Sequence, residues 1–175
     1  MGIGIVRRRS LSRLATLVVA LVLTCTAPAF AKLMSIPSGN PVVAVDIPGG
    51  WTTSTSKRGI EVKSPDGEIF FWIEVYLPAD HDAVVGEHRR YFTKQQVATV
   101  GEGTSTATTE GTAKITATDF TATWKGKPTV LRYLEIDPGL PAGNQILLSY
   151  WASPEGDATH DVAFKKILKS LGPPR

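Results

Sequence analysis

The chain has 175 residues, with 19 Lys and Arg, 16 Asp and Glu, and a formal net charge of +3 at pH 7. Four of the basic residues lie within residues 1–31, which contain no acidic residue. Subtracting these four arginines leaves 15 basic and 16 acidic residues in 32–175, a net charge of −1. We therefore expect no nucleic-acid partner, because contacts to phosphates need a concentrated positive surface.

Residues 1–31 have the order of a secretory signal peptide. Arg7, Arg8, Arg9 and Arg13 come first, the apolar run 14–23 follows, and small residues end in Ala29-Phe30-Ala31. The apolar run has about ten residues, whereas a membrane-spanning helix needs roughly 20. We expect cleavage between Ala31 and Lys32, export to the periplasm or out of the cell, and no membrane insertion of the mature chain.

Two alternatives concern the export route and a lipid anchor. Arg8-Arg9-Ser10-Leu11 partly resembles a twin-arginine signal, which would carry the protein out in its folded state. The ordinary unfolded route is favoured, because arginines are common in any signal of this type. Cys25 lies where a lipoprotein cysteine could stand, but Thr24 occupies the preceding position, which normally holds a smaller residue. Cys25 is the only cysteine, so the mature chain would have no thiol and no disulfide.

Residues 32–175 are expected to form a single α+β domain. Residues 32–41 are rich in turn formers, and alternating β-branched and aromatic residues then predict strands at 42–47, 59–63, 68–77, 129–136 and 145–152. Both faces of 68–77 are largely apolar, which indicates a central strand. Apolar residues at helical intervals predict helices at 81–100, starting at an Asp80 cap, and at 159–171.

The stretch 99–123 contains ten threonines and allows two interpretations, a flexible linker or Thr-rich strands. The alternation of Phe120, Ala122 and Trp124 with threonine favours strands near 104–109 and 115–124. Together these elements predict a single antiparallel sheet of about six strands, sandwiched with one helix inserted mid-chain and one C-terminal helix.

Four short motifs fall at matching places in this pattern. They are Ile47-Pro48-Gly49-Gly50-Trp51, Ser64-Pro65-Asp66-Gly67, Lys125-Gly126-Lys127-Pro128 leading into Leu131-Arg132-Tyr133, and the final Ile167-Leu168-Lys169-Ser170-Leu171. In this arrangement the chain resembles the PsbP-like group, which includes a photosystem II extrinsic subunit, a nuclear Ran-binding protein and bacterial exported proteins of unclear role. The resemblance implies an antiparallel sheet between helices. It implies no shared catalytic residues, and roles in binding, assembly or adaptor work.

The first candidate cluster for metal binding or acid/base chemistry is His81, Asp82 and His88. Two helical turns bring the histidines to the same side of the predicted helix. The usual helical metal-binding pair is four residues apart rather than seven, and His88 falls on the apolar stripe. The structural interpretation, a helix start and a core histidine, is therefore preferred.

The second candidate cluster is Asp157, His160 and Asp161, just ahead of the last predicted helix. Here Asp157 or Thr159 is more simply a helix cap. No serine lies in a Gly-x-Ser-x-Gly elbow, and Gly101-Glu102-Gly103 is predicted to be a helix exit rather than a cofactor loop. We therefore expect no cofactor, and Glu61, Glu74 and Glu135 are expected at ordinary exposed strand positions.

The aromatic side chains are the stronger binding candidates. The sequence has four tryptophans, Trp51, Trp72, Trp124 and Trp151, in segments that could converge in the core. Alternatively, Trp51 and Trp151, which adjoin turns, could line a groove for a peptide or apolar partner. The leading hypothesis is an exported, non-enzymatic binding or accessory protein of the cell envelope. The rivals are a small metal-dependent or acid/base enzyme that uses either cluster, and a structural subunit of an envelope complex. The pattern predicts no oligomeric state.

Overall fold

The computed structural model describes residues 31–140 and 142–175. The predicted export signal, with its arginines and Cys25, therefore lies outside the described residues, and only the Ala31–Lys32 junction falls within them. No helix in the described part of the chain is long and apolar enough to cross a membrane.

The chain forms nine strands and two α-helices over its described length. In chain order they are β1 (Lys32–Ile36), β2 (Val43–Ile47), β3 (Thr52–Thr55), β4 (Gly59–Lys63), β5 (Ile69–Tyr76), α1 (His81–Lys94), β6 (Val97–Glu110), β7 (Ala113–Trp124), β8 (Lys127–Asp137), β9 (Gln145–Ala152) and α2 (Pro154–Ser170). A single 3₁₀ turn, Pro78–Asp80, precedes α1.

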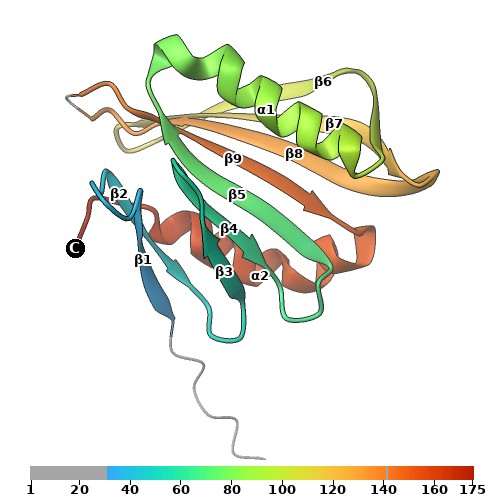
Figure 1. Ribbon diagram of the computed structural model, residues 1–175, viewed down its shortest axis with the longest axis horizontal. Helices are drawn as coiled ribbons and strands as arrows, with labels where there is room; N and C mark the ends of the chain where they lie inside the picture. Colours follow the sequence, from blue (N-terminus) through green and yellow to red (C-terminus); the bar gives the residue numbers. More distant parts are fainter. Residues whose placement is uncertain (1–30, 141) are drawn as a thin grey trace, which may run out of the picture.

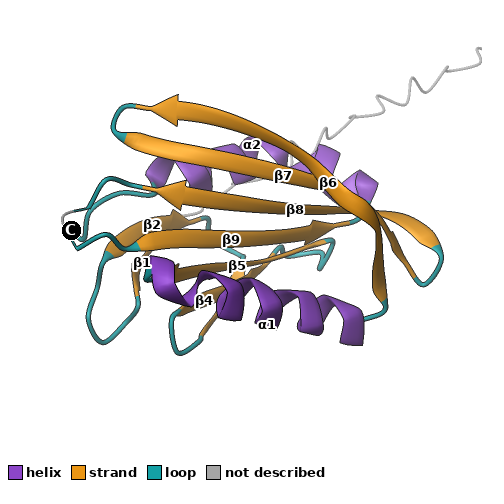
Figure 2. Ribbon diagram, turned by 90° about the horizontal axis from the view of Figure 1, so that it is seen from above, coloured by secondary structure: helices purple, strands orange, loops and turns teal. Residues whose placement is uncertain are grey.

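Seven strands make one antiparallel sheet in the order β3-β4-β5-β9-β8-β7-β6, while β1 and β2 pair separately. Helix α1 covers one face of the sheet, and α2 covers the other together with the β1–β2 pair (Figures 1 and 2). The predicted α+β sandwich is confirmed. The expected count of about six strands is wrong: the main sheet has seven, and a second sheet has two.

Strand β5 is the centre of the packing, because all eight of its residues are buried. Its Ile69, Phe71, Ile73 and Val75 pack toward α2 and the β1–β2 pair, in a core that also includes Ile36, Val45, Phe164 and Ile167. Its Phe70, Trp72 and Tyr76 pack toward α1, with Val84, Phe92, Tyr133 and Leu147. The alternation of side chains along a strand thus divides the apolar core between the two faces of the sheet, as the sequence predicted.

Several helix and strand boundaries differ from the predicted ones, because sequence patterns are weakest at the ends of elements. Residues 32–36 form β1 rather than a turn-rich segment, and they pair with β2 from Lys32↔Ile47 to Ile36↔Val43. Helix α1 ends at Lys94, and the chain turns at Gln96, whose φ is 64°, into β6. Helix α2 begins five residues earlier than expected, after Ser153, whose hydroxyl accepts a hydrogen bond from the Gly156 amide.

The threonine-rich stretch forms strands β6 and β7, which confirms the strand interpretation. The two strands pair antiparallel from Val97↔Trp124 to Glu110↔Ala113. Every residue of β6 after Val97 is exposed, so burial contributes little to this strand. The branched Cβ of threonine suits the pleated backbone even where no apolar core covers it.

Glycine at position 59 is required by a close approach between two strands of the sheet. A Cβ placed on Gly59 would lie 1.8 Å from the Ile73 carbonyl oxygen of β5. We expect Gly59→Ala to lower the free energy of unfolding by about 3 kcal/mol, because the clash is with backbone and cannot be relieved by a rotamer change. Urea unfolding followed by circular dichroism measures this effect.

The matched control is Gly39→Ala, where no atom lies within 4 Å of the added Cβ. That variant should stay within about 0.5 kcal/mol of the parent protein. Equal stability of the two variants would contradict the close packing of β4 on β5.

Candidate functional site

A buried charge cluster around Glu74 lies between the sheet and α1. The Glu74 carboxylate accepts hydrogen bonds from Arg58 Nε at 3.0 Å and Nη2 at 2.9 Å, from Ser56 Oγ at 2.8 Å, and from His88 Nε2 at 3.1 Å. Arg58 also pairs with Glu87 on α1. Glu74 and His88 are 5% and 2% exposed, so the expectation of an ordinary exposed Glu74 is wrong.

The ionised state of Glu74 is set by competition between burial and hydrogen bonding. Burial alone would raise the pKa of this carboxyl group, but the bonds from His88, Ser56 and Arg58 outweigh it and lower the pKa to about 2. Because an ionised carboxylate can only accept, His88 Nε2 carries the proton in its bond to Glu74. The cluster therefore holds a carboxylate, a guanidinium group and an imidazole in one fixed arrangement.

Ser149, His88 and Glu74 together have the residue types of a nucleophile, a base and an acid. The Ser149 hydroxyl lies 2.5 Å from His88 Nδ1, with His88 Nε2 on Glu74 at the other side. However, Ser149 is fully buried, so its oxygen has no open path to a substrate. The arrangement joins β5, β9 and α1, and the expected core position of His88 is confirmed.

The first predicted cluster is divided between two separate sets of partners. His81 Nδ1 lies 2.9 Å from Asp82 and His81 Nε2 lies 3.4 Å from Glu135 on β8. The hydrogen bond that His81 donates to the Asp82 carboxylate and the nearby Glu135 charge raise the pKa of His81. His88 meets neither of these carboxylates. Asp80 stands at the N-cap of α1, but its side chain makes no capping hydrogen bond.

The second predicted cluster is likewise separated. His160 Nε2 lies 2.7 Å from Asp66 in the β4–β5 turn, and Asp161 pairs with Lys165. Asp157 accepts a hydrogen bond from the Tyr150 hydroxyl at 2.9 Å and does not cap α2, so the capping prediction for Asp157 or Thr159 is wrong. Within the described residues no group of three His, Cys, Asp or Glu side chains is placed to hold a metal ion.

The four tryptophans divide between core and surface. Trp72 is buried beneath α1, and Trp51 packs edge-on against His160 and tilted against Phe71. Trp124 is 39% exposed, and its ring meets that of the half-buried Trp151 at 76° with centroids 5.5 Å apart. The two possibilities left open by the sequence therefore both occur, each for two of the four rings.

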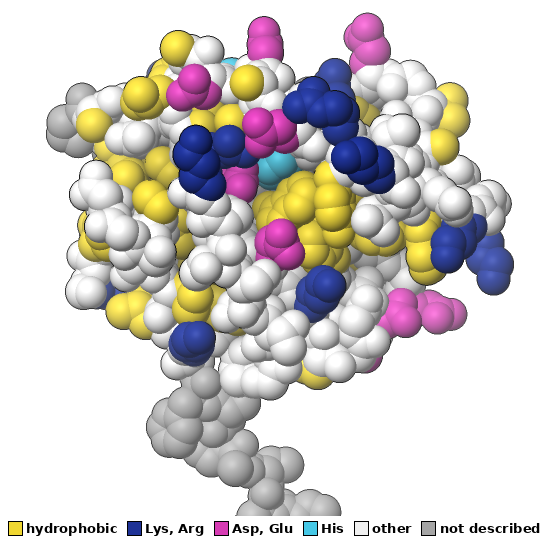
Figure 3. Space-filling view, viewed as in Figure 1, with side chains coloured by type: hydrophobic (Ala, Val, Ile, Leu, Met, Phe, Trp, Pro, Cys, Tyr) yellow, Lys and Arg dark blue, Asp and Glu magenta, His cyan; other side chains and the backbone are white. Residues whose placement is uncertain are grey.

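Trp124 and Trp151 line a surface cavity of about 540 Å³, which we call the tryptophan groove. Its walls come from the β4–β5 turn, the β7–β8 turn and the start of α2, and its other lining residues include Phe70, Lys127, Pro128, Pro154 and Glu155. Trp124 Nε1 donates to the Gln95 carbonyl and Trp151 Nε1 donates to Thr129 Oγ1, which fixes both indole rings. Hydrophobic side chains also reach the surface on the face seen in Figure 3, with basic and acidic side chains around them.

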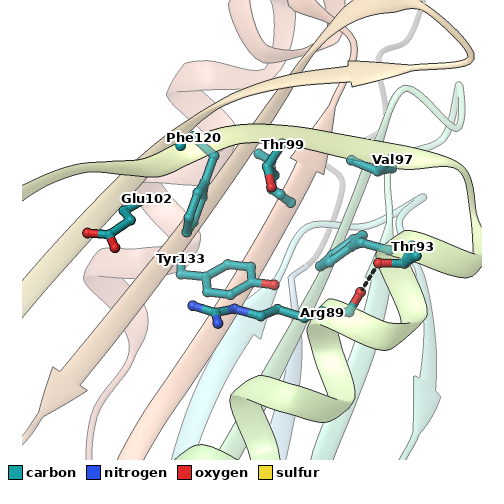
Figure 4. A pocket seen from close by; sticks show the side chains of 10 residues that line it. Arg89, Thr93, Val97, Thr99, Glu102, Phe120 and Tyr133 are labelled. Carbon is teal, nitrogen blue, oxygen red and sulfur yellow. Dashed lines mark hydrogen bonds between the residues drawn. The ribbon is translucent and has the colours of Figure 1, made fainter.

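A second cavity, of about 490 Å³, lies between α1 and strands β6, β7 and β8, and we call it the helix–sheet pocket. Phe92, Val97, Phe120, Leu131 and Tyr133 supply its apolar and aromatic lining, while Arg89, Thr93, Thr99 and Glu102 supply polar groups. Figure 4 shows the Arg89 side chain running beside the Tyr133 ring, with Phe120 and Glu102 across the same space. Sequence reasoning found neither this pocket nor the partners of Glu74.

A bulge in β6 shapes the rim of the helix–sheet pocket. Val100 pairs with Thr121 and Thr104 pairs with Asp119, so three residues of β6 stand opposite Phe120 alone. Gly101 and Gly103, with φ of 72° and 87°, allow this turn of the backbone. The predicted helix exit at Gly101-Glu102-Gly103 is therefore wrong, because these residues lie inside a strand and direct Glu102 to the pocket.

No family model matches this sequence, and no curated protein matches it either. Among solved structures, the solution structure of cyanobacterial PsbP (CyanoP) from Synechocystis matches with a TM-score of 0.57 and 10% sequence identity, over 86% of this chain and 96% of that one. The chain has a PsbP-like fold. The fold expected from the four short motifs is thereby confirmed, while identity this low carries no function with it.

A second solved structure is less similar. It is a Pseudomonas aeruginosa protein of unknown function described as a putative regulator, PA94, with a TM-score of 0.40 and 14% identity, over 83% of this chain and 99% of that one. The PsbP-like comparison accordingly rests on the cyanobacterial structure.

The Glu74 cluster predicts an acid-sensitive contribution to stability. The pKa of Glu74 is lowered in the folded state, so its stabilisation is complete above the unfolded value of 4.5 and is lost as the pH falls toward about 2. Glu74→Gln should reduce the free energy of unfolding by about 3 kcal/mol at neutral pH, because Arg58 and His88 lose their carboxylate partner. Urea unfolding at neutral pH and at about pH 2.5 should show this difference shrinking in acid.

Glu110→Gln is the matched control, since Glu110 is an exposed carboxylate near the end of β6. It should change the free energy of unfolding by less than about 0.5 kcal/mol at either pH. A pH-independent effect of Glu74→Gln would contradict an ionised, hydrogen-bonded Glu74.

Proposed function

We propose that this protein is an exported, non-enzymatic accessory protein of the cell envelope that binds an extended peptide segment of a partner in the tryptophan groove. The observation that carries this proposal is the fixed Trp124–Trp151 pair at an open surface. Aromatic residues at the centre of a pocket supply most of the binding energy in protein recognition.

The chemistry of the groove favours a peptide. Both indole N–H groups are already satisfied within the protein, so the rings offer their faces and carbon edges to a ligand. Such surfaces accept apolar side chains and prolines of an extended segment. Lys127 and Glu155 add charges of both signs beside the aromatic rings. These charges can pair with polar backbone groups or charged side chains of the bound segment.

The placement of the reactive side chains supports a binding role over an enzymatic one. Ser149 and His88 are buried between the sheet and α1, and Glu74 is held by Arg58 and Ser56. His160 is engaged with Asp66, and Asp157 with Tyr150. These groups serve contacts between elements of the fold, whereas the tryptophan groove is open.

The predicted export signal supports the proposed envelope location and has its own test. The purified exported protein should begin at Lys32, because Ala29-Phe30-Ala31 has the small residues that signal peptidase requires. Intact-mass spectrometry measures the N-terminus directly. A lipid on Cys25, or a chain that keeps residues 1–31, would contradict the proposed processing.

The peptide-binding proposal predicts position-dependent cross-linking in cells. A photo-reactive amino acid at Lys127, on the tryptophan groove, should give a discrete adduct whose cross-linked partner segment is identified by mass spectrometry. Trp124→Ala in the same background should reduce the adduct about tenfold or more, because a central aromatic contact is worth about 2 kcal/mol. Circular dichroism establishes that this variant is folded.

The matched control places the same photo-reactive residue at Thr106, which is exposed on β6 and does not line the groove. It should give no such adduct. Equal adducts from both positions, or an adduct unaffected by Trp124→Ala, would contradict the groove as the binding site. Turnover of a defined substrate that a single substitution abolishes would favour the enzymatic rival instead.

A further inference from the structure

We propose that the helix–sheet pocket binds a small aromatic or apolar zwitterion, a molecule that carries a carboxylate and an ammonium group close together, as a free aromatic amino acid does. This site is distinct from the tryptophan groove, and the two share no lining residue. A negative result for peptide binding in the tryptophan groove therefore leaves this proposal unaffected, and the reverse also holds.

The size and the lining of the pocket suit a small molecule. Its volume of about 490 Å³ lies within the range of about 300–1,000 Å³ that is usual for small-molecule sites. Phe92, Leu131 and Tyr133 are buried and form one wall, and the half-buried Phe120 forms another. The Phe120 and Tyr133 rings meet at 67° with centroids 5.2 Å apart, so two aromatic surfaces border the same space.

Arg89 supplies a positive charge that is not used elsewhere. Arg58, Arg132 and Arg175 each have a carboxylate partner, whereas Arg89 has no acidic group within 4.0 Å in the described part of the chain. Its side chain lies along the pocket wall in Figure 4 rather than extending away from the protein. A guanidinium group so placed can take a carboxylate through two parallel hydrogen bonds.

Glu102 supplies the opposite charge on the other side of the pocket. It too has no basic partner within 4.0 Å among the described residues, and it stands on the bulge that Gly101 and Gly103 make possible. A ligand with only a carboxylate would meet repulsion from Glu102, and one with only an ammonium group would meet repulsion from Arg89. A zwitterion satisfies both charges at once.

The Tyr133 hydroxyl adds a polar group to this wall. Burial raises the pKa of Tyr133 to about 12, so the hydroxyl stays protonated and can donate a hydrogen bond. Only 4% of the residue is exposed, and no hydrogen bond joins its hydroxyl to another described residue. The hydroxyl can therefore donate to a carboxylate held by Arg89.

The test compares three probes that differ only in their charged groups. Isothermal titration of the purified protein should show that L-phenylalanine binds about tenfold or more tightly than 3-phenylpropanoate, which lacks the ammonium group, or phenethylamine, which lacks the carboxylate. Arg89→Ala should weaken phenylalanine binding about tenfold or more. Glu102→Gln should weaken phenylalanine binding and leave 3-phenylpropanoate binding unweakened.

Arg90→Ala is the matched control, because Arg90 is the neighbouring exposed arginine of α1 and does not line the pocket. It should leave phenylalanine binding unchanged. The proposal is overturned if no probe binds at about 10 mM, if 3-phenylpropanoate binds as tightly as phenylalanine, or if Arg90→Ala has the effect expected of Arg89→Ala. If Arg89→Ala fails to fold, Glu102→Gln alone is the test. Equal weakening of phenylalanine and 3-phenylpropanoate by Glu102→Gln then contradicts the assignment.

Discussion

The structure depends on one central strand that is buried on both faces and carries a single charged residue. Strand β5 contacts the α2 side through its odd-numbered residues and the α1 side through its even-numbered residues, and Glu74 is the exception to this apolar pattern. An isolated buried carboxylate would be costly, so Arg58, Ser56 and His88 surround it with hydrogen-bond donors. The same contacts tie the β3–β4 turn and α1 to the sheet. Glu74 is thus the position at which the apolar core and the charged cluster are in contact.

The helix–sheet pocket and the tryptophan groove both follow from what the helices leave uncovered. Helix α1 packs over the middle of the sheet, while β6 diverges at its bulge, and the helix–sheet pocket lies between them. The tryptophan groove lies where the β4–β5 turn, the β7–β8 turn and the start of α2 come together. None of the residues of the Glu74 cluster lines either of these two cavities. Arg58 of that cluster instead borders a third cavity, of about 430 Å³.

Similarity to a cyanobacterial PsbP at 10% identity shows how little sequence the fold requires. What the two chains share is the fold, and many sets of apolar residues can fill the core of one fold. The Arg89, Glu102 and Tyr133 arrangement and the Trp124–Trp151 pair are properties of individual side chains of this chain. Function therefore has to be argued from these sites rather than from the fold.

The sequence by itself determined the α+β class, the central position of β5 and the turns at Asp66-Gly67 and Lys125-Gly126, where the positive φ of the glycines suits a reversal of the chain. These features are local, because alternation and turn chemistry act over a few residues. Only the tertiary structure decided that Glu74 is buried, since its partners Arg58 and His88 are 16 and 14 residues away along the chain. A lone carboxylate inside an apolar strand was the available signal, but its partners could not be chosen without the packing of α1. The pairing of β1 with β2, the β6 bulge and the placement of Arg89 and Glu102 around one pocket likewise depend on contacts between elements, which no local pattern encodes.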